Sequence, residues 1–219
     1  MAELNTEEEQ LEAIKRWWKE NGTSLIAGVV IAAAGIFGWK AWESYQANQA
    51  EAASVRYQQL LTLASQPTLE DAALTQAREQ ITALNDEHGG SLYADLATLI
   101  EARLAVSDGD LTGARDALSR LIESSDRAYL KDLARLRLAR LQLADDDADA
   151  ALASLDAIDS QALSAQRMDL RGDAQLALGN REDAREAYRE ALATAEASGQ
   201  PLFGTQLKLD NLGAEEATL

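Results

Sequence analysis

The chain has 219 residues, 47% of them hydrophobic and 26% charged, which supplies one folded domain with an appendage and excludes an intrinsically disordered chain. It contains no cysteine and one histidine, so disulfide frameworks, cysteine zinc sites and thiol catalysis are excluded. The net charge of −17 disfavours nucleic acid as a partner, because phosphates would be repelled.

The first distinctive feature along the chain is a run of 19 residues without charge, from Asn21 to Trp39. A helix of that length extends about 28 Å, close to the hydrocarbon thickness of a bilayer. Aromatic residues, which favour the headgroup layers, flank the run at Trp17, Trp18, Trp39, Trp42 and Tyr45. The pattern predicts a transmembrane helix over residues 21–42. The apolar run continues beyond the small residues 32–34, which favours a retained anchor over a cleaved signal peptide.

The basic residues beside this helix predict its orientation. Those that closely precede it are Lys15, Arg16 and Lys19, whereas only Lys40 closely follows it. An excess of Lys and Arg marks the cytoplasmic flank of a membrane helix. We therefore expect residues 1–20 to be cytoplasmic and residues 43–219 to be exported. In a bacterium this describes a single-pass inner-membrane protein with a periplasmic domain.

Three small residues share one face of the predicted anchor. Gly28, Ala32 and Gly35 follow one another at steps of four and three, which allows close approach of another membrane helix. Small residues are also common in membrane spans without a packing role, so both interpretations stay open.

The residues that follow the anchor predict further helices. The stretch 41–64 contains no glycine or proline and is rich in good helix formers, and Pro67 ends it. Thr68 and Asp71 have the spacing of a capping box, which predicts a second helix to about Glu87. No segment alternates polar and apolar residues as a half-buried strand does. Residues 41–219 carry a net charge of −15, so the exported part is strongly acidic.

A repeated spacing appears from residue 91 onward. A small residue is followed by another twelve positions later and by a large apolar residue four positions after that, and the third copy adds one more small residue. The residues concerned are Ala102, Ala114 and Leu118; Ala139, Ala151 and Leu155; and Gly172, Ala184, Tyr188 and Ala191. This spacing is typical of tetratricopeptide helix pairs, in which two helices cross closely where both carry small residues.

These patterns together predict an all-α protein, in which a single N-terminal transmembrane helix precedes an α-solenoid of tetratricopeptide-like helix pairs. Such pairs must stack to bury their faces, and the last pair needs a cap. The predicted repeats cover residues 91–124, 129–159 and 163–197, and a capping helix covers about 201–212.

The first helices of such pairs line a concave surface that commonly binds other proteins. Two repeats place matching residues there, namely Leu96, Leu99 and Arg103 in the first and Leu133, Leu136 and Arg140 in the second. The leucines could hold a peptide segment and the arginines a carboxylate. The alternative is that neighbouring helices bury these leucines.

Other candidate sites have simpler explanations. Asp145, Asp146, Asp147 and Asp149 lack the glycine and glutamate of a calcium-binding loop, which favours a solvated turn. The single histidine, His88, lies at a predicted helix end, where it suits a capping role. No phosphate loop or nucleophile elbow occurs, so we expect neither enzymatic activity nor a cofactor.

The N-terminal sequence EEEQLEAIKRWWKENG, followed at once by the anchor, resembles the start of the YfgM family. The matching stretch is residues 10–22, and the segment LKLDNL at 207–212 resembles the closing segment of that family. The order of anchor and repeats agrees as well, while residues 67–90 carry no family signature.

This resemblance implies an ancillary subunit of the bacterial SecYEG translocon. It further implies a partnership with the periplasmic chaperone PpiD, contact with emerging secretory polypeptides, and a looser link to the stress regulator RcsB. The alternative is an envelope-assembly scaffold that serves cell division or cytochrome maturation.

Overall fold

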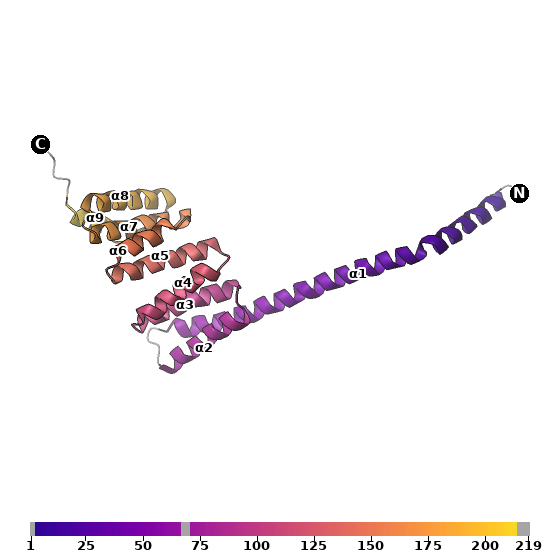
Figure 1. The fold of residues 1–219 in the computed structure, drawn as a ribbon, viewed down its shortest axis with the longest axis horizontal. Coiled ribbons are helices and arrows are strands. Elements are labelled where there is room, and N and C mark those ends of the chain that lie inside the picture. Colours follow the sequence, from indigo (N-terminus) through magenta and orange to yellow (C-terminus); the bar gives the residue numbers. More distant parts are fainter. Residues whose placement is uncertain (1–2, 67–70, 214–219) are drawn as a thin grey trace. The chain divides into compact units, whose positions relative to one another are not determined.

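The computed structural model describes residues 3–66 and 71–213, and these residues form helices and no strand (Figure 1). The helices are α1 (Glu3–Ala64), α2 (Asp71–Glu87), α3 (Leu92–Ser107), α4 (Leu111–Ser124), α5 (Ala128–Ala144), α6 (Ala148–Asp156), the 3₁₀ helix η1 (Gln161–Leu163), α7 (Ser164–Ala177), α8 (Arg181–Ser198) and α9 (Thr205–Asn211). The all-α prediction is confirmed. The chain divides into two units, residues 1–52 and 53–219.

The first unit consists of the larger part of α1. Among the described residues, α1 is the one helix that is long and apolar enough to cross a membrane. Its large apolar side chains point outward, and Ile31 and Phe37 are each 72% exposed, unlike the residues of a soluble core helix. This pattern suits a helix surrounded by lipid. Within the helix, the ring of Trp18 covers Gly22.

The small-residue face of the anchor is exposed. Ala32 is exposed, and a Cβ atom added at Gly28 or Gly35 would meet no other atom within 4 Å. The residues predicted to flank the membrane are all exposed on α1: Lys15, Arg16, Trp17, Trp18, Lys19, Trp39 and Trp42. A partner for this face stays a prediction.

The second unit begins with the end of α1 and with α2, two helices that the sequence predicted without indicating that they form a pair. The end of α1 and α2 pack together on α3, and one core joins Leu60, Leu84 and Ile100 from the three helices. The capping box expected at Thr68 and Asp71 involves Thr68, which lies outside the residues that the structure describes.

The remaining helices stack in chain order, and each core joins one pair to the first helix of the next (Figure 1). Leu99 of α3, Leu118 of α4 and Leu130 of α5 share one core. The next core joins α5, α6 and α7. Helices α3 and α5 therefore each belong to two cores, which is the nearest-neighbour architecture of a solenoid.

The repeat-packing residues lie where the helices of a pair cross. All are buried or nearly so: Ala102, Ala114, Ala139, Ala151, Gly172, Ala184, Tyr188 and Ala191. The approach is close between α7 and α8, where a Cβ atom at Gly172 would overlap the ring of Tyr188. Glycine is required there because any side chain would displace the tyrosine.

The turns within the three repeats place one left-handed residue at equivalent positions. Gly109 has φ 78° and Gly179 has φ 83°, and Asp146 takes the same place in the second repeat with φ 61°. Aspartate tolerates this conformation better than most side chains, because its short polar group can bond locally. The second repeat therefore keeps the turn without the glycine that would identify it.

The cap begins later than predicted. Helix α9 starts at Thr205 rather than near 201, because Gly204 adopts a left-handed conformation with φ 85° at the helix start. Leu209 and the buried Leu212 cover the face formed by Ala184 and Tyr188.

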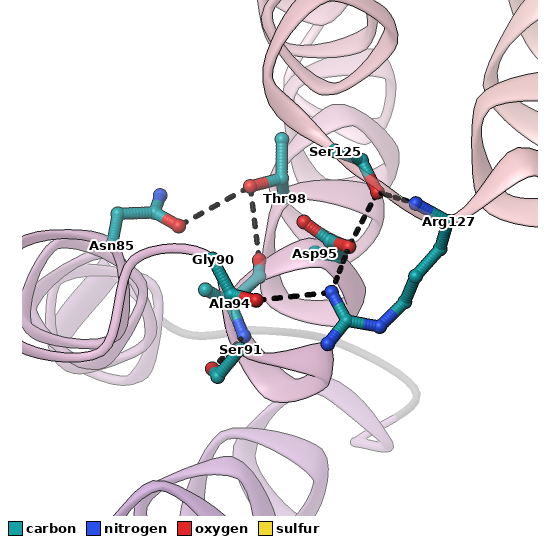
Figure 2. Close-up of polar contacts among 8 residues, drawn as sticks. All are labelled: Asn85, Gly90, Ser91, Ala94, Asp95, Thr98, Ser125 and Arg127. Carbon is teal, nitrogen blue, oxygen red and sulfur yellow. Dashed lines mark hydrogen bonds and ion pairs between the residues drawn. The ribbon is translucent and has the colours of Figure 1, made fainter.

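Aspartates on the first helices join successive pairs. Figure 2 shows Asp95 of α3, which is 5% exposed and accepts hydrogen bonds from the Ser125 hydroxyl at 2.6 Å and from Arg127 at 2.9 Å. Both donors lie immediately before α5. The bonds therefore fix the start of one pair to the first helix of the pair before it. We call this arrangement an aspartate clasp.

The clasp recurs at intervals of 37 residues. Asp132 of α5 accepts from the backbone N–H groups of Asp159 at 3.2 Å and Ser160 at 2.9 Å, in the turn that leads to α7. Asp169 of α7 accepts from the Thr205 hydroxyl at 2.9 Å, at the start of α9. The cap thus attaches to the last pair in the manner in which one pair attaches to the next.

The close crossing of α7 and α8 predicts the effect of enlarging Gly172. We expect Gly172→Val to lower the free energy of unfolding by roughly 1–3 kcal/mol, because the new methyl groups overlap the Tyr188 ring. The measurement is denaturant unfolding of the full chain in detergent micelles, followed by helical circular dichroism. The control Ala193→Val adds the same group type on an exposed face of α8. An equal loss of unfolding free energy in the two variants would contradict the close crossing of α7 and α8 at Gly172.

Candidate functional site: an arginine-lined hollow

The leucines predicted to line a groove belong to the core. Leu99 and Leu136 are 5% and 2% exposed, and Leu96 and Leu133 are half-buried against the same cores. The physical reason is that each first helix is covered on several sides by its own pair and by its neighbours. Neighbouring helices therefore bury these leucines, which is the alternative interpretation given above. Arg103 and Arg140, in contrast, are exposed.

These two arginines line a hollow of about 300 Å³ between α3, α4 and α5. A third arginine, Arg137, joins them, and the sequence pattern did not single it out. The other lining residues are apolar: Ala102, Val106, Leu118 and Leu141. We call this site the arginine hollow.

The hydrogen bonds of the arginines position them without neutralising them. Arg103 donates to the carbonyl oxygen of Ala64 at 2.7 Å, at the end of α1, and Arg137 donates to that of Leu99 at 3.3 Å. A guanidinium group has five N–H donors, so most remain available. Burial lowers the pKa of Arg137, and the neighbouring charges of Arg140 and Arg103 lower it further.

No carboxylate of the described residues forms an ion pair with these three arginines. Several other arginines of the repeats do have such partners. Arg120 pairs with Glu101 at 2.8 Å, and Arg171 pairs with Asp156 at 2.8 Å. In a chain with 37 acidic and 20 basic residues, three adjoining cations without a carboxylate are unusual. The hollow therefore combines unmatched positive charge with an apolar floor.

A second hollow, of about 520 Å³, lies beside the first and shares Arg140 with it. Its charges are matched, because Lys208 binds Asp169 at 3.0 Å and Asp173 at 2.7 Å. Burial lowers the pKa of Lys208, but hydrogen bonds to both aspartates outweigh that effect and leave the pKa above its ordinary value.

The tyrosine beneath this second hollow is held neutral. The Tyr188 hydroxyl donates to Asp173 at 2.8 Å. Burial raises the pKa of Tyr188, and the hydrogen bond to Asp173 and the charge of Asp169 raise it further.

The acidic turn considered as a calcium site performs local structural roles. Asp147 caps α6 by accepting from the N–H of Ala150 at 3.1 Å, and Asp145 pairs with Arg115. His88 follows the end of α2, where its backbone N–H donates to the carbonyl oxygen of Leu84. Within residues 3–66 and 71–213, no group of three or more His, Cys, Asp or Glu side chains is arranged to hold a metal ion.

Comparison with known proteins identifies the family. A family model described as a tetratricopeptide repeat-like domain matches residues 15–214, a range that includes the anchor. No solved structure matches the chain significantly.

Three curated relatives are each named ancillary SecYEG translocon subunit. One from Aggregatibacter actinomycetemcomitans is 36% identical over 97% of this chain and 100% of its own length. One from Haemophilus influenzae is 30% identical with the same coverage, and one from Escherichia coli K12 is 34% identical over 94% of this chain and 96% of its own.

The fold and these comparisons define a tetratricopeptide-like protein with one N-terminal helix that is long and apolar enough to cross a membrane. Within that class, the chain belongs to the YfgM family of ancillary SecYEG translocon subunits. The resemblance found in residues 10–22 is thereby confirmed.

The pKa shifts at the second hollow predict a loss of stability at alkaline pH. Above about pH 10 an unfolded tyrosine ionises, whereas Tyr188 keeps its proton in the fold, so the free energy of unfolding falls as pH rises. Lys208 acts in the same direction, because its stabilisation is lost as pH rises through its raised pKa.

Denaturant unfolding of the full chain at pH values between about 9 and 11 measures this slope. In Tyr188→Phe, the free energy of unfolding should decline less steeply with pH, and the difference in slope should correspond to about one proton. Tyr129→Phe is the control, because Tyr129 is 49% exposed, and it should decline as the unmodified chain does. If Tyr188→Phe and the unmodified chain decline with equal slopes, the assignment is wrong.

Proposed function

We propose that this chain is a non-enzymatic ancillary subunit of the SecYEG translocon that mediates contacts between the translocon, the chaperone PpiD and the periplasmic chaperone network. The observation that carries the proposal is the likeness to translocon subunits over nearly the whole chain, with anchor and repeats in one matched region. A scaffold that had only the repeats in common with these proteins would not extend that likeness through the anchor.

The proposed topology has three parts. Residues 1–20 are cytoplasmic, residues 21–42 span the bacterial inner membrane, and residues 43–219 form the periplasmic tetratricopeptide-like domain. The excess of basic residues before the span supports this orientation, since it marks the cytoplasmic flank.

In the membrane, the face formed by Gly28, Ala32 and Gly35 packs against a helix of the translocon or of PpiD. Small residues on one face let two backbones approach closely, and this face is open in the chain itself. In the periplasm, the arginine hollow contacts PpiD or an emerging secretory polypeptide. Its unmatched charge supports a role in binding rather than in packing.

Photocrosslinking in intact membranes tests the proposal. At 100° per residue, Ile36 lies beside the small-residue face and Phe37 lies opposite to it, although both are well exposed (64% and 72%). A photoreactive residue at Ile36 should crosslink to SecY, SecE, SecG or PpiD, and one at Phe37 should do so much less.

One outcome would contradict the proposal: a known translocon partner crosslinks under the same conditions, while this chain yields only unrelated envelope proteins. The chain would then serve as an envelope-assembly scaffold. Equal yields at the two positions would retain the translocon role and remove the small-residue face from it.

A further inference from the structure

We propose that the arginine hollow binds a short polypeptide segment in which an acidic residue adjoins a large apolar one. The carboxylate lies among Arg103, Arg137 and Arg140, and the apolar side chain lies on the floor of the hollow. This inference rests on the proposed function, because it names the chemistry by which the periplasmic domain recognises a partner.

The charge of the hollow selects the acidic part. Three like charges adjoin one another, and none of them forms an ion pair with a carboxylate in the described part of the chain, although residues 41–219 carry a net charge of −15. Repulsion among the guanidinium groups is relieved when an anion enters between them. A carboxylate fits best, because its two oxygens accept a pair of N–H groups from one arginine.

The floor of the hollow selects the apolar part. Leu118 is 1% exposed at its base, and Val106 is 42% exposed at its edge. A volume of about 300 Å³ holds one or two side chains rather than the surface of a folded domain. The ligand is therefore a segment of chain, and burial of its apolar side chain adds affinity that a simple anion would lack.

The net charge of the domain selects a polypeptide over other anions. That negative charge repels an extended polyanion or an anionic membrane. A segment with one or two carboxylates is repelled less, and the three arginines attract it. The net charge thus disfavours the wrong class of partner while the hollow accepts the right one.

Peptide binding to the full chain in nanodiscs of zwitterionic lipid tests the inference. The probe is a fluorescent ten-residue peptide of alternating glutamate and leucine, and fluorescence anisotropy gives its affinity. Replacing its glutamates with glutamine should weaken binding by about tenfold or more, as should replacing its leucines with alanine. Comparing amidated and free-acid peptides distinguishes side-chain carboxylates from a chain terminus, and binding of either form supports the inference.

Variants of the protein locate the site. Arg140→Gln and Arg137→Gln should each weaken binding by about tenfold, because each removes a charged donor. The matched control is the double variant Arg56→Gln and Arg78→Gln, whose arginines form exposed ion pairs with Glu87 and Asp108 elsewhere in the domain. It removes more positive charge and should bind as the unmodified chain does. Helical circular dichroism should show that all variants remain folded.

Three results would overturn the inference: equal binding of the glutamine peptide, unchanged affinity in the Arg137 and Arg140 variants, or an equal loss in the Arg56 and Arg78 control. Vesicles of phosphatidylglycerol that displace the peptide, and that bind less well to Arg140→Gln, would assign the hollow to lipid and also overturn it. Any of these results leaves crosslinking from Ile36 unaffected. Failure of the peptide chemistry is thus distinguishable from failure of the translocon assignment.

Discussion

The repeat domain depends on the aspartate clasps, because they fix where each helix pair begins relative to the one before it. Burying a carboxylate costs free energy unless the carboxylate is hydrogen-bonded. Asp95 is hydrogen-bonded because the segment directly before α5 places Ser125 and Arg127 against it. The apolar cores supply most of the stabilisation, but leucine contacts tolerate small shifts, whereas these bonds do not. The Asp95 clasp also joins the two helices, α3 and α5, that carry the three arginines of the arginine hollow.

Charge is distributed unevenly over this fold, and the distribution gives the molecule its proposed specificity. Several arginines of the repeats are matched by carboxylates, as Arg127 is by Asp95. In the second hollow, Lys208 likewise pairs with two aspartates. The arginine hollow instead gathers three arginines that form no ion pair with a described carboxylate, and these arginines lie on the first helices, the elements that usually present a binding surface in tetratricopeptide arrays. The anchor and the hollow would then act together, since membrane attachment raises the local concentration of the domain near its partners.

The sequence predicted the anchor, the helix pairs and the family, because each rests on a strong local signal such as an uncharged run or small residues twelve positions apart. It did not predict which leucines face outward. Helices α3 and α5 are apolar on most sides, so their periodicity does not distinguish the core face from the groove face. The 37-residue spacing of Asp95, Asp132 and Asp169 is present in the sequence, but 37 acidic residues conceal it. The pair formed by α1 and α2 carries no small-residue signature.

Hydrogen exchange of the full chain in micelles, with the variant Asp95→Ala, tests the central claim most directly. Loss of the clasp should leave Ser125 and Arg127 without their acceptor and lower the opening free energy at the start of α5 by about 1–3 kcal/mol. Amides from residues 125 to 132 should then exchange at least about tenfold faster, while those of α7 and α8 change little. Asp116→Ala, at an exposed position on α4, is the control and should change neither region. Unchanged exchange at the start of α5, or an equal increase along all repeats, would contradict the account.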